Sequence, residues 1–86
     1  MRELTKCFKA LANERRLRVL KELYYREPLT INTIAKRIKL SLKSTSKHMQ
    51  KLSDCDLIER SNNSLQVWCR INRKHPLVRS IIAHLK

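Results

Sequence analysis

The spacing of apolar residues changes twice along this 86-residue chain. Up to Asp54 they recur every three or four residues, which predicts helices. From residue 57 to 71 they alternate, which predicts a β-hairpin, and helical spacing returns from Pro76. This order predicts a mainly α fold with one β-hairpin, in the α+β class, formed by a single domain over residues 1–86.

Capping residues divide the helical part into four segments. Asn13, Thr30 and Ser41 are N-cap residue types, and each precedes a run of apolar residues at helical spacing. Pro28 ends the second helix, because the residue before a proline avoids the helical region. The third and fourth helices are short and separated by a tight break, which predicts a helix-turn-helix over about 30–54. The stripe that we expect to be buried in the second helix comprises Leu17, Leu20, Leu23 and Tyr24.

A hairpin that follows a helix-turn-helix is a wing, which we place at about 57–71. Asn62 and Asn63 tolerate positive φ, so we expect a two-residue turn there. One face of the second strand would comprise Leu65, Val67, Cys69 and Ile71. The last helix, about 76–86, is too apolar for a lone exposed tail, which predicts that it buries a face against a partner.

The formal net charge of +13 favours a polyanionic partner, either nucleic acid or an anionic membrane surface. No apolar run approaches the roughly 18 residues that spanning a bilayer requires, and the N-terminal residues show no signal-peptide block. We therefore expect a cytoplasmic protein without a membrane partner.

Other residue types exclude further classes. The chain has no glycine, which removes glycine-rich phosphate loops, and we expect no cofactor. Cys7, Cys55 and Cys69 lack metal spacing, so structural thiols are favoured over a redox switch and, last, a metal site. No nucleophile elbow or paired acids occur, so we do not expect an enzyme.

The segment LSLKSTSKHMQKL, residues 40–52, carries its charge on one side of the fourth helix. On a helical wheel Leu42, Thr45, Met49 and Leu52 cluster opposite Lys43, Lys47, Gln50 and Lys51, with Ser44, Ser46 and His48 on the flanks. No acid occurs between Pro28 and Ser53, so the lysines repel one another unless an external anion, such as DNA phosphate, neutralises them. Gln50 suits adenine and lysine suits guanine. We interpret this segment as a recognition helix rather than a solvated lysine face.

Three segments together resemble the winged-helix transcriptional regulators of the arsenic-repressor (ArsR) type. FKALANERRLRVLKEL is similar to that family's second-helix signature, LSLKSTSKHMQKL to its recognition helix, and LIERSNNSLQVWCRI to its wing. The resemblance implies a homodimeric repressor that binds a palindromic double-stranded DNA operator. It implies dimerisation through the helices at about 2–12 and 76–86, with interface residues Leu4, Phe8, Leu77, Val78, Ile81, Ile82 and Leu85.

The resemblance also implies DNA contacts. In the recognition helix these would be Ser41, Lys43, Ser44, Ser46, Lys47 and His48, to which the wheel adds Gln50 and Lys51. At the wing tip Arg60, Ser61, Asn62 and Asn63 would reach the minor groove.

The chain departs from the family at its glycine and metal-ligand positions. Lys39 and Asp56 replace two family glycines, and because lysine tolerates left-handed geometry less well than aspartate, we expect strain at Lys39. The cysteine pair of many members is missing, and no acid follows Glu59 to complete a site with His75 and His84, so we expect no metal site. The alternative function is a winged-helix module that docks protein or RNA and binds DNA only non-specifically.

Overall fold

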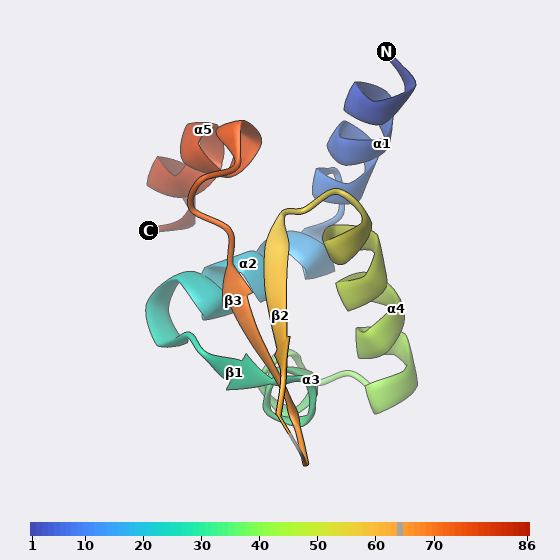
Figure 1. Ribbon diagram of the computed structural model, residues 1–86, viewed down its shortest axis with the longest axis vertical. Helices are drawn as coiled ribbons and strands as arrows, with labels where there is room; N and C mark the ends of the chain where they lie inside the picture. The colour runs from blue at the N-terminus through green and yellow to red at the C-terminus, as the bar shows by residue number, and fades with distance from the viewer. Residues whose placement is uncertain (64) are drawn as a thin grey trace.

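The computed structural model describes residues 1–63 and 65–86, whose arrangement is shown in Figure 1. The elements follow in the order α1 (Arg2–Leu11), α2 (Glu14–Arg26), β1 (Leu29–Thr30), α3 (Ile31–Ile38), α4 (Leu42–Asp54), β2 (Ile58–Asn62), β3 (Val67–Ile71) and α5 (Pro76–Leu85). Helices α3 and α4 form a helix-turn-helix, and β2 and β3 form a wing. The predicted winged helix-turn-helix fold is confirmed, and β1 is the one element that the sequence did not predict.

Side-chain caps set the starts of the central helices as predicted. Asn13, Thr30 and Ser41 each accept backbone N–H groups from the first turn of α2, α3 and α4. Pro76 is the first residue of α5, where its missing N–H needs no partner. Helix α2 ends at Arg26, two residues before Pro28. Residues close in sequence therefore determine these boundaries.

Two helix ends turn left-handed without glycine. Lys39, after α3, has φ 59°, and Asp56, after α4, has φ 57°. In each turn the N–H of the next residue, Leu40 or Leu57, donates to the carbonyl five positions earlier at 3.0 Å, which is a Schellman motif. The hydrogen bonding is regular at Lys39. The strain comes from the left-handed φ of Lys39. This conformation lowers stability by roughly 1 kcal/mol for a lysine, whereas a glycine would adopt it without that cost.

The wing belongs to a three-stranded antiparallel sheet in the order β1-β3-β2. Asn62 pairs with Val67, and the Asn63 N–H donates to the Gln66 carbonyl at 2.9 Å. The two-residue turn that we expected at Asn62 and Asn63 is therefore wrong, because Asn62 is in a strand and pairing continues past it. Leu65 precedes β3 and is 92% exposed, so it is not part of the buried face of this strand. Ser64 lies outside the described residues.

A single apolar core joins the helices to the sheet. Leu20 and Leu23 of α2, Ile34 of α3, and Met49 and Leu52 of α4 are fully buried. The stripe expected on α2 is wrong at one position, because Leu17 is 37% exposed while the neighbouring Val19 is fully buried.

Helix α5 contributes part of its apolar surface to this same core. Val78 is fully buried and Leu85 is 6% exposed within one chain, so both pack in the core, and their assignment to the dimer interface stays a prediction. Leu77, Ile81 and Ile82 are only half-buried. Fewer apolar residues of α5 are therefore exposed for contact with a partner than the sequence predicted.

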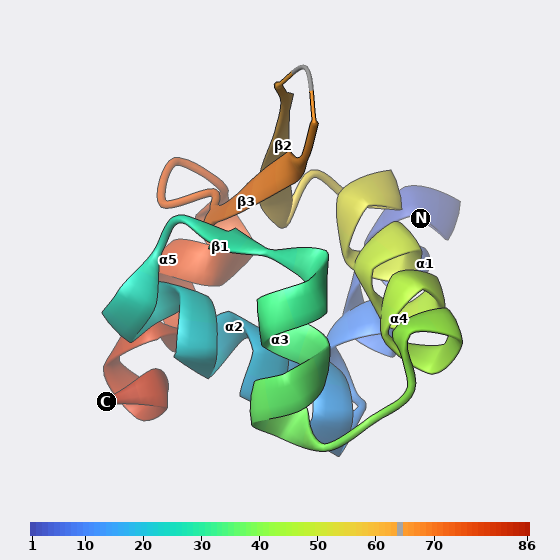
Figure 2. The ribbon, with the colours of Figure 1, turned by 90° about the horizontal axis from the view of Figure 1, so that it is seen from below.

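The elements divide between two ends of the molecule (Figure 1). The tip of the wing and the N-terminal end of α4 lie toward one end, and α1 and α5 lie toward the other. Seen from below, the hairpin of β2 and β3 projects beyond the helical body (Figure 2). In the described part of the chain no helix combines the length and apolarity needed to cross a membrane.

Candidate nucleic-acid interface

Helix α4 buries one side and exposes the other. Thr45, Met49 and Leu52 are fully buried against the core, whereas Lys43 and Lys47 are exposed. Leu42, which the wheel placed with the apolar cluster, is 50% exposed. The cationic side of this helix therefore faces solvent, as the recognition-helix interpretation requires.

The lysines of α4 have no acidic partner among the described residues. The ion pairs found there involve arginines: Glu22 with Arg37 at 2.6 Å and with Arg26 at 3.6 Å, and Glu27 with Arg73 at 2.9 Å. These acids therefore neutralise arginines outside α4. The lysine charges of α4 remain available to an external anion.

Two of the predicted DNA-contact residues already have partners inside the protein. Gln50 donates from Nε2 to Oδ1 of Asp54 at 2.7 Å, one helical turn away. His48 accepts at Nδ1 from Nε of Arg16 at 3.2 Å. Burial, followed by the charges of Arg16 and Arg15, lowers the pKa of His48 below its ordinary value. A neutral His48 that accepts from Arg16 connects α4 to α2. This hydrogen bond is present in the protein without DNA.

A groove of about 560 Å³ separates the first half of α4 from the wing. It brings together three of the predicted contact residues, Ser46, Asn62 and Asn63. It also contains residues that we did not predict as contacts: Asn32, Leu42, Leu65 and Gln66. The position of Asn32 in the helix before the recognition helix was a usable signal, because that helix crosses the DNA backbone in a helix-turn-helix.

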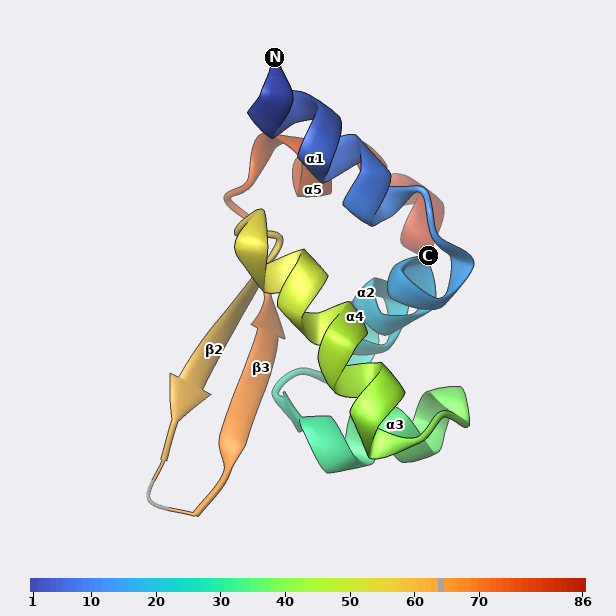
Figure 3. The ribbon, with the colours of Figure 1, turned by 90° about the vertical axis from the view of Figure 1, so that its right-hand side faces the viewer.

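The other predicted contacts surround this groove or lie apart from it. Lys43, Ser44 and Lys47 are exposed on α4 without lining the groove, and Arg60 and Ser61 are exposed along β2. Ser41 is also exposed, although its Oγ accepts the Ser44 N–H as the helix cap. Lys51 faces α1 and lines a different pocket. In Figure 3 the C-terminal end of α4 lies beside the start of β2, and α4 and the wing then spread apart as both descend toward the same end of the molecule.

The cysteines are free and buried, and they are apart from this surface. Burial raises the pKa of Cys55 to about 12, and a hydrogen bond with Cys7 acts in the same direction. Burial likewise raises the pKa of Cys69. High thiol pKa values make these two cysteines poor nucleophiles and poor metal ligands at neutral pH.

Histidine and acidic side chains do not gather into a metal site in the described residues, where no group of three or more potential ligands occurs. Nδ1 of His75 instead accepts the Leu77 N–H at 3.1 Å as the cap of α5.

Comparisons with known proteins agree with this geometry. A family model described as a helix-turn-helix domain matches residues 11–61. No sequence among curated proteins matches the chain. Fold and surface together define a winged helix-turn-helix DNA-binding protein.

Similar solved structures identify the family. The homodimeric winged helix-turn-helix DNA-binding domain of Mb0332 from Mycobacterium bovis is 26% identical with a TM-score of 0.80, covering 96% of this chain and 74% of that one. The transcriptional repressor PagR of Bacillus anthracis is 27% identical with a TM-score of 0.80, covering 99% and 94%. An ArsR-family transcriptional regulator is 30% identical with a TM-score of 0.76, covering 96% and 86%. The chain belongs to the ArsR family of winged helix-turn-helix transcriptional regulators.

Proposed function

We propose that this protein is a homodimeric repressor that recognises a specific double-stranded operator through α4 and the wing. The observation that carries this proposal is the lysine face of α4, which is exposed, has no acidic partner among the described residues, and adjoins the groove shared with the wing. Neutralising DNA phosphates with these lysines would release counterions. The small hydroxyl and amide side chains beside them suit hydrogen bonds to phosphates and base edges.

The contacts divide into two groups by their position. Lys43, Lys47 and Ser44 on the open face of α4 would enter the major groove and contact its backbone and base edges. Ser46, Asn62 and Asn63 line the α4–wing groove, where they would follow the sugar-phosphate strand between the major and minor grooves. Arg60 and Ser61 extend this surface along the wing. Ser41, His48, Gln50 and Lys51 contribute less, since each has an internal role or faces away from the groove.

Dimerisation through α1 and α5 completes the proposal. Leu4 is 45% exposed and Phe8 is 52% exposed on α1, a large apolar surface for a chain of this size. Leu77, Ile81 and Ile82 are half-buried on α5, which lies at the same end of the molecule as α1. A two-fold dimer would present two copies of α4 to half-sites about one helical turn of DNA apart, so the operator would be palindromic. Mb0332 is homodimeric and PagR is a repressor, which supports both parts of the proposal.

We infer that regulation does not use the metal sites common in this family. The three cysteines are buried, the pKa values of Cys55 and Cys69 are raised, and His75 is engaged as a helix cap. The proposed repressor therefore responds to another signal or binds constitutively.

Gel shift with the DNA upstream of the gene, in the presence of excess unrelated competitor, tests operator recognition. A complex that persists in excess competitor supports a sequence-specific regulator. Loss of the complex at equal masses of competitor would instead favour the module that binds DNA by charge alone. Lys43→Gln with Lys47→Gln should abolish the persistent complex, while Lys74→Gln with Lys86→Gln removes the same charge outside α4 and should retain it.

Light scattering tests the dimer separately. Phe8→Glu places a charge on the proposed interface at a position that is half exposed in one chain, so folding should survive while the dimer dissociates. Leu65→Glu, on the wing, is the matched control and should remain dimeric. A dimer that persists in the Phe8 variant would place the interface elsewhere.

A further inference from the structure

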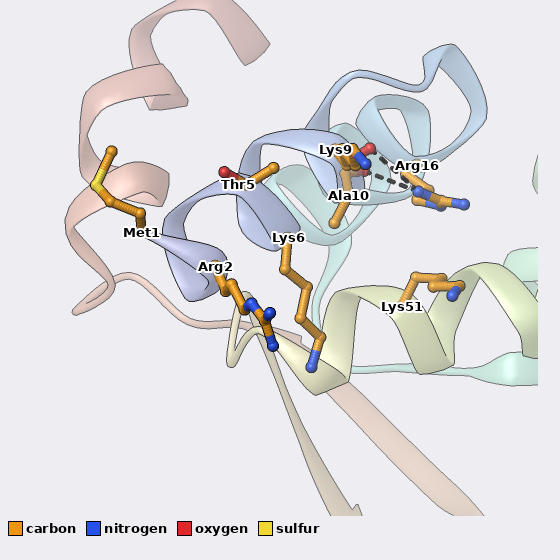
Figure 4. Close-up of a pocket in the computed structure, with 8 residues that line it drawn as sticks. All are labelled: Met1, Arg2, Thr5, Lys6, Lys9, Ala10, Arg16 and Lys51. Atoms are coloured by element: carbon orange, nitrogen blue, oxygen red, sulfur yellow. Dashed lines mark hydrogen bonds between the residues drawn. The ribbon is translucent and has the colours of Figure 1, made fainter.

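A second cationic surface lies away from the α4–wing groove. A pocket of about 630 Å³ lies between α1, the start of α2 and the C-terminal half of α4 (Figure 4). Its lining comprises Met1, Arg2, Thr5, Lys6, Lys9, Ala10, Arg16 and Lys51. Five of these eight residues are cationic and none is acidic. It shares no lining residue with the α4–wing groove.

Arg16 is held in place at one wall of this pocket. Its Nε donates to His48, and its Nη1 donates to the carbonyls of Lys9 and Ala10 at 3.4 Å each. Figure 4 shows the two bonds to α1 as dashed lines. Its Nη2 makes no hydrogen bond to any described residue, so two N–H groups of a fixed guanidinium are left for a ligand. A guanidinium that is already oriented loses little freedom on binding an anion.

The remaining cations repel one another unless an anion is bound. Arg2 and Lys6 are four residues apart on α1, and Lys9 is three further on, so all three share one side of the helix. Arg2 and Lys6 extend from α1 in the direction of α4, which carries Lys51 (Figure 4). None of the five cations forms an ion pair with an acid in the described part of the chain. A ligand with more than one negative charge would relieve this repulsion.

The exposed apolar residues of α1 leave this pocket open. On a helical wheel Leu4 and Phe8 lie on the side opposite Arg2, Lys6 and Lys9. A dimer formed through Leu4 and Phe8 would therefore cover the other side of α1. The pocket remains accessible in the assembly that we propose for the regulator.

We propose that this pocket is a phosphate-binding site. A phosphomonoester carries close to two negative charges, and neighbouring phosphodiesters of a duplex carry one each. Either arrangement also offers several acceptor oxygens, which matches an open guanidinium edge surrounded by ammonium groups better than a single carboxylate does. The phosphate comes either from a free phosphorylated small molecule or from the backbone of the bound duplex. In both cases it would join α1 to α4 through Arg16, whose Nε also orients His48 on the recognition helix.

Titration of the full chain with inorganic pyrophosphate tests the site without DNA. At constant ionic strength, ¹⁵N NMR should show saturable shifts of the Arg16 side-chain Nε–H and of the amides of α1 and the end of α4. Lys6→Gln with Lys9→Gln, both exposed positions, should weaken the binding at least tenfold. Lys74→Gln with Lys86→Gln removes equal charge elsewhere and should leave the binding unchanged. Shifts that do not saturate, or that are equal in the two double variants, would overturn the proposal.

The salt dependence of DNA binding then identifies the source of the phosphate. If the pocket holds backbone phosphates, the Lys6 and Lys9 double variant should lower the slope of log affinity against log salt by about one for each phosphate that it no longer neutralises. If saturable pyrophosphate binding occurs and the slope is unchanged, the ligand is a free phosphorylated molecule. Only this second measurement rests on the proposed function, so a failure of operator recognition would leave the pyrophosphate result intact.

Discussion

Helices α2 and α4 are built alike and differ in how their charges are paired. Each has 13 residues, each starts at a side-chain cap, and each buries an apolar side in the same core. In α2, Glu22 pairs with Arg26 of the same helix and Arg37 of α3. In α4 the one acid, Asp54, accepts from Gln50 rather than from a lysine. The lysines of α4 therefore remain without an acidic partner in the described chain.

This difference separates the charges that Glu22 pairs between α2 and α3 from the unpaired binding face of α4. Charges that are paired across elements stabilise the arrangement of α2 and α3 and have no capacity left for a ligand. The exposed lysines of α4 form no such ion pairs. Their mutual repulsion is relieved only when an anion binds. A substitution of a paired charge of α2 should thus lower stability and leave DNA binding unchanged. A substitution of a lysine of α4 should weaken DNA binding and leave stability nearly unchanged. Substitutions of buried apolar residues should lower stability equally in both helices.

The largest effect is expected on the shared core. Leu23→Ala in α2 and Leu52→Ala in α4 should each lower the free energy of unfolding by about 2–5 kcal/mol, because both side chains are fully buried. Leu17→Ala should cost less than about 1 kcal/mol, since that side chain is 37% exposed. Urea denaturation measures all three. A Leu52 variant as stable as the parent protein would show that α4 is loosely packed, and would end the comparison with α2.

The polar faces should separate the two helices. Glu22→Gln should lower the free energy of unfolding by about 1 kcal/mol, because it leaves Arg37 without its partner across α2 and α3. Lys47→Gln should change it by less than about 0.5 kcal/mol. DNA affinity measured by fluorescence anisotropy should show the reverse order, with a several-fold loss for Lys47→Gln and none for Glu22→Gln. Equal losses of affinity in the two variants would contradict the division of roles.

The two N-caps sharpen the comparison at single residues. Asn13→Ala and Ser41→Ala should each cost about 1 kcal/mol of stability, because each removes an acceptor from the first turn of its helix. Aspartate is also a good N-cap, so Asn13→Asp and Ser41→Asp should both keep the parent stability. The new charge at Ser41 would repel DNA phosphates and weaken binding, whereas the charge at Asn13 should not. Equal affinity in both aspartate variants would remove Ser41 from the DNA surface.

The parts of this fold that depend on neighbouring residues were predictable from the sequence. Caps at Asn13, Thr30 and Ser41 and the stop before Pro28 involve interactions within a few positions, so the residue types determine them. The face of α4 followed from its periodicity and from the absence of acids nearby. Lys39 and Asp56 stand where the family has glycines, and these positions predicted the two left-handed turns. The elements on either side fix the backbone geometry there, whichever residue is present.

The parts that depend on distant residues were not predictable. Strand β1 has two residues and exists only because it pairs with Cys69 and Trp68 of β3. Leu17 is 37% exposed and Val19 is fully buried, and the period of α2 alone does not specify this choice. The hydrogen bond from Arg16 to His48 spans 32 positions. The cationic pocket likewise combines the first helix with Lys51, and no local pattern brings those residues together.

The hydrogen bond between Arg16 and His48 connects the two helices directly, and it should make stability depend weakly on pH. The pKa of His48 is lowered in the folded chain by burial and by Arg16 and Arg15, so the unfolded chain binds a proton first as the pH falls. Stability from this contact is complete above the ordinary histidine pKa near 6.5 and is lost as the pH falls through the lower folded value. The free energy of unfolding should therefore decrease from pH 7.5 to pH 5. His48→Gln should lose that part of the decrease. A His48 ring resonance with an NMR titration midpoint above 6.5 would contradict the assignment, because it would mean that the folded chain favours the charged imidazole beside Arg16.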